Sequence, residues 1–365
     1  MILHVTEACG GGVRRHLQLL VPELMRRGLD CGIFAFGNRM EPGFREDLAS
    51  MMQRGCKVAM VRGTAMAAWT VFRRVLREWS PRLLHSHAAR GGLLARLCCG
   101  DIPVLHSPHG LPIPGTLRHR LIYGMERLVG SRTAAYILVS PAEQESMFSL
   151  GISPKKCHIV CNGVPPELAS QACTAETARR TLGLPAEGKL IGVPARLVAQ
   201  KGLDTMLRAL PAIHPDCRLV LCGEGPERDR LVKLADTLGV QSRVVFAGHV
   251  EGLWRLLRAF DAIALPSRYE GLSYALLEAI ALECPLIASD IPANVPNPEL
   301  RPHLHLFPPD NAEALALAVN DLLSHPDQSR AHASQAKLLL DRDFSLETQA
   351  ESLVQLYAKW LVTSS

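Results

Sequence analysis

Two glutamates stand eight positions apart in the stretch ALPSRYEGLSYALLEAIA, at Glu270 and Glu278. The apolar DAIALPS predicts a buried strand, and Ser273 is placed to cap a helix that begins at Tyr274. Glu270 then belongs to the loop and Glu278 to the helix. On one continuous helix, eight residues would separate them by about 80° and ~12 Å. Each carboxylate could therefore hold a different set of hydroxyl groups on one long ligand, with a phosphate at the amides of residues 271–274 between them.

A second motif, ARLVAQKGLD, carries two cations in a loop between a predicted strand and a predicted helix. Arg196 offers a planar fork of donors and Lys201 a point charge. Two cations near a helix N-terminus suit a diphosphate. The alternative is a pair of solvated surface cations.

Two further loops carry unusual residues. In EACGGGVRRH, the run Gly10 to Gly12 opens a helix, where exposed amides favour an anion, although a tight turn is the alternative. In HSPHG, His109 follows an apolar strand, with a structural histidine as the alternative. His85 and His87 share one face of a strand end, and we interpret them as packing or interdomain groups.

Composition bounds the kind of protein. The chain has 365 residues, 48% of them hydrophobic, a net charge of +5 and 11 cysteines. We expect about two domains, a reducing compartment and no nucleic-acid partner, because the charge is mild. No charged leader or long apolar run is present, so we expect a cytoplasmic protein that does not cross membranes. Cys157, His158 and Cys161 lack a second cluster that would complete a metal site.

Short apolar runs alternate with helical patterns along the whole chain, which is typical of parallel sheets covered by helices. The runs MILHVT, CGIFAFG, CKVAMV, RLLHSH, IPVLHSPHG and AAYILVS predict the strands of a first half. The runs KLIGVPARL, CRLVLCGEG, SRVVFAGHV, FDAIALPS, CPLIASD and LHLFPPD predict those of a second. The polar stretch ASQACTAETARRTLGLPAEGK between them is the best candidate for a linker. A final amphipathic helix carries Leu353, Tyr357 and Trp360.

Taken together, these motifs resemble family-four retaining nucleotide-sugar glycosyltransferases. EGLSYALLE looks like the family's E-x7-E motif, ARLVAQKGLD like its R…KG loop, LCGEGPER like its G-x-G-P turn, GGGVRRH like its glycine turn and SPHG like its histidine loop. The resemblance implies the GT-B architecture, an α/β fold of two Rossmann-like doubly wound parallel-sheet domains facing each other across a cleft. We expect an acceptor-side domain at 1–167, a nucleotide-sugar-binding domain at 168–343, and a helix at 344–365 that packs back onto the first.

The resemblance also implies a role for each motif. Arg196 and Lys201 would hold the donor diphosphate, Glu270 the sugar hydroxyls and Glu278 the ribose. His109 would stand near the transferred sugar, which gives His109, Arg196, Lys201 and Glu270 as catalytic residues. The remaining expected donor-binding residues are Gly11, Gly12, Gly248, His249, Val250, Gly271, Leu272 and Ser273.

The implied reaction is retaining transfer from a nucleotide-diphosphate sugar, which we expect to be a UDP-sugar, to a saccharide or lipid-linked saccharide in bacterial envelope or exopolysaccharide synthesis. We expect no metal and no other cofactor. Two alternatives stay open: a nucleotide-sugar epimerase of the same fold, and a degenerate protein that binds a sugar nucleotide without turnover. The missing G-x-G-x-x-G disfavours a nicotinamide dehydrogenase.

Three positions depart from the family's pattern. Glu283 stands where the family usually has a glycine after the E-x7-E helix, and a left-handed cap there would cost a glutamate about 1 kcal/mol. Pro292 and Ala293 replace a common Gly-Gly pair beside the donor sugar. Ala195 replaces a glycine before Arg196.

The stretch PGTLRHRLIYGMERLVGSR predicts an amphipathic helix. Its apolar face holds Leu117, Leu121, Ile122, Met125, Leu128 and Val129, and the arginines outside that face are Arg118, Arg120, Arg127 and Arg132. An ordinary packed helix is one interpretation. The other is peripheral contact with the anionic inner face of the plasma membrane.

Overall fold

The computed structural model describes residues 1–37, 40–41, 43–110 and 117–361, with the side chains of residues 118, 119 and 122 left out. The chain forms two compact units. One comprises Met1–Gly163 with Leu346–Ser365, and the other Val164–Ser345. The sequence places these boundaries at 167/168 and 343/344. In the structure they lie at 163/164 and 345/346, and the Val164 amide donates to the Phe344 carbonyl, which joins both ends of the second unit.

The first unit is built on a parallel sheet in the order β3-β2-β1-β4-β5-β6-β7. Its strands are β1 (Ile2–Thr6), β2 (Cys31–Phe36), β3 (Lys57–Val61), β4 (Leu83–His87), β5 (Val104–Ser107), β6 (Ala135–Leu138) and β7 (Cys157–Ile159). The register pairs His4 with His85 and Thr6 with His87. These polar residues therefore lie side by side near the carboxyl ends of the central strands.

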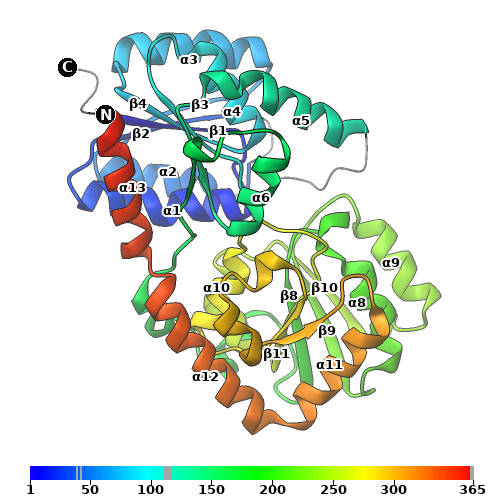
Figure 1. The fold of residues 1–365 in the computed structure, drawn as a ribbon. Coiled ribbons are helices and arrows are strands. Elements are labelled where there is room, and N and C mark those ends of the chain that lie inside the picture. The colour runs from blue at the N-terminus through cyan, green and yellow to red at the C-terminus, as the bar shows by residue number, and fades with distance from the viewer. Residues whose placement is uncertain (38–39, 42, 111–116, 362–365) are drawn as a thin grey trace. The chain divides into compact units, whose positions relative to one another are not determined.

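Helices cover both faces of this sheet (Figure 1). They are α1 (Gly11–Arg26), α2 (Phe44–Gln53), α3 (Ala65–Trp79), α4 (Ala88–Cys98), α5 (Leu117–Val129), α6 (Pro141–Ser149) and α13 (Leu346–Leu361). Leu17, Phe44 and Tyr357 pack on one face, from α1, α2 and α13, while Phe72 and Ala95 pack on the other, from α3 and α4. The final helix, red in Figure 1, contacts α1 and so completes the first unit.

The second unit is a parallel sheet in the order β10-β9-β8-β11-β12-β13. Its strands are β8 (Lys189–Pro194), β9 (Cys217–Cys222), β10 (Val244–Gly248), β11 (Ala262–Leu265), β12 (Leu286–Ser289) and β13 (His305–Phe307). This is the doubly wound order in which the chain reverses direction between β8 and β11. Loops that follow these two strands therefore flank the switch point, where ligands bind in such sheets.

The helices of the second unit are α7 (Ala175–Thr181), α8 (Leu203–Ala209), α9 (Arg228–Thr237), α10 (Tyr274–Ala281), α11 (Ala312–Ser324) and α12 (Pro326–Asp343). Met206, Leu231 and Val319 bring α8, α9 and α11 into one apolar core with the sheet. Helix α10 is almost wholly buried and contacts α12. Helix α10 therefore directly follows the loop that holds Glu270.

The predicted linker is instead part of the second unit, and this expectation was wrong. Residues 175–181 form α7, whose first turn is capped by the Thr174 hydroxyl. The Arg179 guanidinium donates to the carbonyls of Ala259 and Ala186, both at 2.8 Å, and pairs with Asp261 at 2.9 Å. These bonds hold a polar segment in a helix, although its composition alone predicts a loop.

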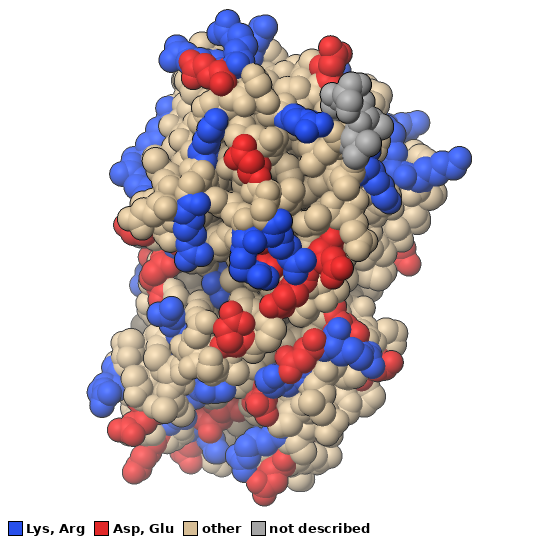
Figure 2. Space-filling model, turned by 90° about the vertical axis from the view of Figure 1, so that its left-hand side faces the viewer, with Lys and Arg blue, Asp and Glu red and all other residues tan. Residues whose placement is uncertain are grey.

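The cysteines form no disulfide bonds, and basic and acidic side chains occur together on the surface. All the cysteines are free thiols, and Cys157, His158 and Cys161 do not converge as ligands among the described residues. Lysines and arginines alternate with acidic residues over the face shown in Figure 2. In the described ranges, no helix combines the length and apolarity needed to span a bilayer.

Candidate functional site

The loops after β8 and β11 are bound to each other at the switch point of the second sheet. The Arg268 amide donates to the Gln200 carbonyl at 2.8 Å, and the Gln200 side chain donates to the Tyr269 carbonyl at 2.9 Å. Gly202 has φ of 61°, and a Cβ there would lie 2.0 Å from the Pro266 carbonyl oxygen. Only glycine allows this approach, so the KG sequence brings the two loops together.

This contact pairs Lys201 with Glu270. The Lys201 ammonium donates to Oε1 of Glu270, and the side chains are only 16% and 10% exposed. The Ser267 hydroxyl donates to the same oxygen at 2.7 Å, while the Gln200 amide lies 3.5 Å from Oε2. From the sequence we interpreted hydroxyl groups of a ligand as suitable partners of Glu270. It has a cationic partner because the two loops are joined in this way.

A buried network of hydrogen bonds holds the backbone of Ser267 in place. The Ser289 hydroxyl, at the end of β12, donates to the Ser267 carbonyl. Asn294 in turn donates to the Ser289 carbonyl at 2.9 Å and is fully buried. Asn294 belongs to the turn Pro292–Asn294 that replaces the family's glycine pair. The departure from the family's pattern is therefore connected to Glu270 through two serines.

Arg268 fastens the same pair of loops without being a predicted site residue. Its guanidinium donates to the Ala199 carbonyl and pairs with Asp204 at 3.0 Å and Asp310 at 2.8 Å. Burial would raise the pKa of Asp204, but Arg268 and Arg208 outweigh burial and hold that pKa below its ordinary value. Arg268 thus positions the loop rather than offering a charge to a ligand.

Arg196 has a different environment from Lys201. Its side chain is exposed, and among the described residues no carboxylate pairs with it. The backbone beside it is fixed by the G-x-G-P turn, since a Cβ on Gly223 would lie 2.1 Å from the Ala195 carbonyl oxygen. Its guanidinium is therefore available to an anion without breaking an ion pair.

The remaining predicted site residues of the second unit are Glu278, the turn before its helix and residues 248–250. Glu278 lies in α10 with 8% of its surface exposed, and Gly271 and Leu272 are buried in the preceding turn. Ser273 stands at the N-cap position, but its side chain does not cap the helix, contrary to expectation. Gly248 ends β10, and the His249 amide directly after it lies 3.4 Å from a carboxylate oxygen of Glu224.

His109 belongs to the first unit and adopts a left-handed backbone, with φ of 57°. The Glu143 carboxylate fixes this turn by accepting from the amides of Gly110 at 2.5 Å and Val139 at 2.8 Å. Burial raises the pKa of Glu143, although both amide bonds oppose the shift. A left-handed non-glycine residue costs about 1 kcal/mol or more, which is typical of a functional loop.

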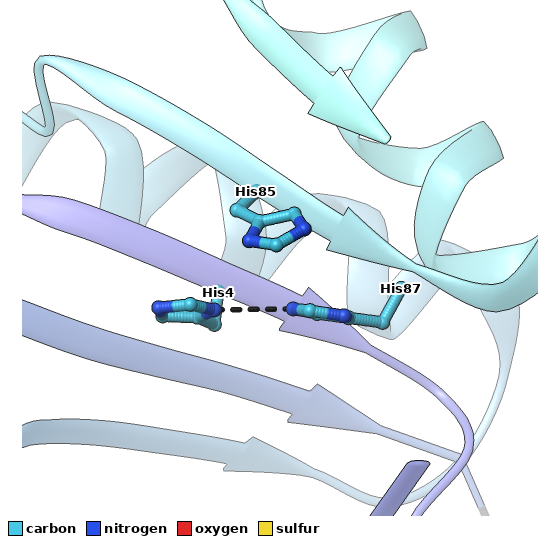
Figure 3. A group of neighbouring side chains, drawn as sticks. All are labelled: His4, His85 and His87. Carbon is cyan, nitrogen blue, oxygen red and sulfur yellow. Dashed lines mark hydrogen bonds between the residues drawn. The ribbon is translucent and has the colours of Figure 1, made fainter. Parts of the chain in front are cut away.

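His109 is also bonded to another imidazole. Its Nε2 lies 2.9 Å from Nδ1 of His87, and its ring meets the edge of the His16 ring at 4.6 Å. Our interpretation of His85 and His87 as packing or interdomain groups missed this contact. The two-residue spacing in HSH places the rings of His85 and His87 on one face of a strand, where Figure 3 shows them beside His4, but it does not reveal the bond to His109.

In the glycine turn of the first unit, one backbone amide is already hydrogen-bonded to a carboxylate. The Gly11 amide donates to Oε1 of Glu41 at 2.7 Å, and Glu41 pairs with Arg14 at 3.2 Å. Gly11 has φ of 58°, whereas Gly12 is exposed with open space where a side chain would begin. The Gly11 amide, which we expected to face a phosphate, is thus hydrogen-bonded to an acidic side chain.

The structure brings Lys201 and Glu270 into contact and places Arg196, Glu278 and residues 248–250 in the same unit. His109, Gly11 and Gly12 lie in the other unit. Sequence reasoning missed the groups that support these residues, namely Gln200, Ser267, Arg268, Glu143 and His87. The capping-box spacing from Ser140 to Glu143 could have revealed one of them.

Comparison with known proteins gives matches along nearly the whole chain. The model described as "Glycosyltransferase Family 4" matches residues 10–168, and "Glycosyl transferases group 1" matches residues 174–338. An uncharacterized glycosyltransferase of Methanocaldococcus jannaschii is 30% identical over 65% of this chain and 63% of its own length. A D-inositol 3-phosphate glycosyltransferase of Corynebacterium urealyticum is 29% identical over 95% of this chain and 90% of its own.

A solved structure shows the same fold. The Anabaena protein HepE, crystallised with UDP, superposes with a TM-score of 0.80 and 18% identity, over 98% of this chain and 99% of that one. With the two parallel sheets described above, this likeness confirms the expected GT-B architecture.

Proposed function

The chain belongs to glycosyltransferase family 4, and from this membership we propose that it transfers a sugar from a nucleotide-diphosphate sugar to a saccharide or lipid-linked saccharide. The observation that carries the proposal is the contact between Lys201 and Glu270 at the switch point of the second sheet. A cation there suits a diphosphate and a carboxylate beside it suits sugar hydroxyls.

We assign the donor to the second unit. The exposed Arg196 and the Lys201 ammonium hold the diphosphate and stabilise its charge as it leaves, so that transfer needs no metal ion. Glu270 accepts from hydroxyls of the donor sugar and Glu278 from those of the ribose. The loops 248–250 and 271–273 border the base and the phosphates. The UDP seen with HepE favours a uridine donor.

The proposed chemistry retains the configuration of the sugar. The bond between the anomeric carbon and the phosphate oxygen breaks as the acceptor oxygen bonds to that carbon from the same face. The acceptor hydroxyl gives its proton to the departing phosphate oxygen, so no enzyme nucleophile is needed. His109 and the glycine turn of the first unit stand near the sugar and the donor phosphate in this proposal.

Binding of the donor can be tested by thermal shift without metal. We expect UDP and UDP-sugars to raise the melting temperature of the wild type. Glu278→Gln should lose much of that rise, and it is preferable to Glu278→Ala because the side chain is buried. Binding without turnover in the presence of acceptors would favour the degenerate alternative, and no nucleotide binding would refute the proposal.

Arg196 provides a sharper version of this experiment. Because its exposed side chain pairs with no carboxylate among the described residues, Arg196→Ala should leave the melting temperature of the free protein unchanged and weaken UDP binding by about 10-fold or more. Arg218→Ala, an exposed arginine within β9, is the matched control and should bind UDP as the wild type does.

We further propose that α5 brings the first unit to the anionic inner face of the plasma membrane. Four apolar side chains of this helix are exposed: Leu117 by 74%, Leu121 by 61%, Met125 by 42% and Leu128 by 79%. Arg120, Arg127 and Arg132 are exposed beside them. The side chains of Arg118 and Ile122 lie outside the described residues. An exposed apolar face beside cations suits an acidic bilayer, where a lipid-linked acceptor would lie.

Vesicle flotation tests this membrane contact. We expect the protein to float with vesicles containing anionic lipid at low salt, and less so with neutral vesicles. Leu121→Gln combined with Leu128→Gln should abolish flotation. Leu317→Gln, which changes an equally exposed leucine on α11, should have no effect. Equal flotation of all three proteins would refute the assignment to α5.

A further inference from the structure

Three imidazoles of the first unit form a continuous hydrogen-bonded chain. Nε2 of His109 lies 2.9 Å from Nδ1 of His87, and Nε2 of His87 lies 3.1 Å from Nδ1 of His4. His4 and His87 are fully buried, whereas His109 at the loop end is part-exposed. Figure 3 shows the bond between His4 and His87 beneath the ring of His85. The chain therefore runs from the sheet interior to the predicted ligand-facing histidine.

The same residues include two triads whose nitrogens lie within 4.8 Å of one another, His4-His85-His87 and His16-His87-His109. A metal ion fits neither triad as it stands. Both nitrogens of His85 are bonded, to Tyr357 at 2.6 Å and to Ser107 at 2.9 Å. Both nitrogens of His87 are bonded to other imidazoles. Ligation would have to break these bonds, so the cluster is better explained by the bonds themselves.

Neutral imidazoles in such a chain cannot choose their tautomers independently. Burial holds the pKa of His4 at about 3 and the pKa values of His87 and His109 well below the ordinary value. Each ring then carries one proton, and each bond needs one N–H and one lone pair. Only two arrangements satisfy both bonds: all three protons on Nδ1, or all three on Nε2.

The buried end of the chain decides between the two arrangements. Nε2 of His4 has no hydrogen-bond partner in the part of the chain that the structure describes. With the protons on Nε2, this atom would be a buried donor without an acceptor, the rarer and costlier kind of orphan, at about 1–3 kcal/mol. With the protons on Nδ1, only a lone pair is left there.

We propose that His87 and His4 are positioning residues that hold His109 in the Nδ1–H tautomer, so that His109 presents a hydrogen-bond donor to an oxygen of the bound substrate. In this arrangement Nε2 of His109 accepts from His87 and cannot serve the substrate. The left-handed backbone at His109 and the Glu143 carboxylate fix the ring's attachment, while the imidazole chain fixes its proton. The role in catalysis rests on the proposed transfer function; the tautomer does not.

Nuclear magnetic resonance tests the tautomer directly. Long-range proton–nitrogen spectra of protein labelled with 15N-histidine distinguish Nδ1–H from Nε2–H rings. At neutral pH we expect His4, His87 and His109 all as Nδ1–H, with signals assigned by single substitutions. An Nε2–H form of His109 would overturn the proposal. So would displacement of the His16, His87 and His109 signals by one equivalent of Zn2+ after EDTA treatment, since that would reveal a metal site.

Variants of His87 test the chain through the ring that donates to His109. His87→Phe removes the donor to His109 and should move His109 away from a single Nδ1–H form. His87→Asn, which can still donate to His109, should keep it. His85→Phe is the matched control, because it replaces a buried imidazole on β4 outside the chain. An unchanged His109 tautomer in folded His87→Phe would overturn the proposal.

Activity provides the second readout. Removing an outer partner that fixes a histidine tautomer costs 10- to 100-fold in metal enzymes. We therefore expect kcat to fall about 10-fold in His87→Phe with the donor KM unchanged, and to recover in His87→Asn. A His109 tautomer that changes while kcat does not would refute the catalytic role. If the wild type transfers no sugar, the proposed function fails, and the spectra still decide the tautomer.

Discussion

Glu270 shows how single residues prepare this site. One of its oxygens accepts from both Lys201 and Ser267, and among the described residues the other oxygen has only a long contact from Gln200 at 3.5 Å. A carboxylate held at one oxygen keeps its orientation while the second remains able to accept from a hydroxyl. In the proposed function, Ser267 would therefore act on the donor sugar through Glu270.

Replacing Ser267 with alanine tests this orientation. Ser267→Ala removes one hydrogen bond of about 1 kcal/mol, and we expect a rise of about 5-fold in the donor KM with little change in melting temperature. Steady-state kinetics measure the effect. Ser334→Ala is a matched control, because Ser334 also donates to a glutamate, Glu283, at 2.6 Å but lies on α12. An equal rise in both variants would contradict the assignment.

Residue types and spacing predicted Lys201 and Glu270 as site residues but not their contact. The two lie 69 positions apart, and their pairing depends on which loops the sheet order brings together. The sequence likewise predicted a histidine at the end of β5, but its bond to His87 depends on the lateral pairing of β4 with β5. Composition cannot reveal such partners because they are set by strand order.

At the scale of elements, α10 ends in the left-handed cap that the family's usual glycine at this position implies. Glu283 has φ of 55°, a left-handed backbone that glycine adopts without strain. The position therefore keeps the family's cap geometry with an unfavourable residue. Its carboxylate recovers part of the cost by accepting from Ser334.

Glu283→Gly should stabilise the protein by about 0.5–1 kcal/mol, since it removes the left-handed strain. Urea unfolding measures the change. Ser334→Ala isolates the hydrogen bond that is lost at the same time, and it should destabilise slightly. A glycine variant less stable than the wild type would mean that the Ser334 bond outweighs the strain.

Strands were the elements best predicted from sequence. The runs named for both halves correspond to strands β1–β6 and β8–β13, because buried parallel strands read as short apolar runs between turns. Helix α7 was missed since its stability comes from Arg179 and the Thr174 cap rather than from an apolar face. The exposed apolar face of α5 could not be told from a packed one by periodicity alone.

At the scale of the whole molecule, the first unit buries an unusual number of neutral imidazoles. His4, His16, His85, His87 and His106 are each less than 9% exposed. Burial lowers the pKa of His4 to about 3, and burial lowers that of His16 to about 4 although Asn162 opposes the shift. The folded chain therefore stays neutral at these rings where the unfolded chain takes up protons.

Stability should consequently fall between pH 7 and pH 5. An unfolded histidine protonates near pH 6.5, so below that pH unfolding takes up a proton that the folded ring refuses. The contribution is fully present above pH 6.5 and is lost as the pH falls toward the folded pKa. His4 and His16 should each account for about 2 kcal/mol over this window. Glu143, whose pKa burial raises, opposes the loss.

Urea unfolding at pH 7, 6 and 5 measures this dependence. In His4→Phe the loss of stability over the window should be smaller by about 2 kcal/mol, because that ring no longer takes up a proton on unfolding. His214→Asn, which replaces an exposed histidine, should keep the slope of the wild type. Carboxylates held at low pKa by arginine, such as Asp290, lose their contribution only at more acid pH, below about 4. A wild-type stability that is flat from pH 7 to pH 5 would therefore show that the buried imidazoles are protonated in the folded chain.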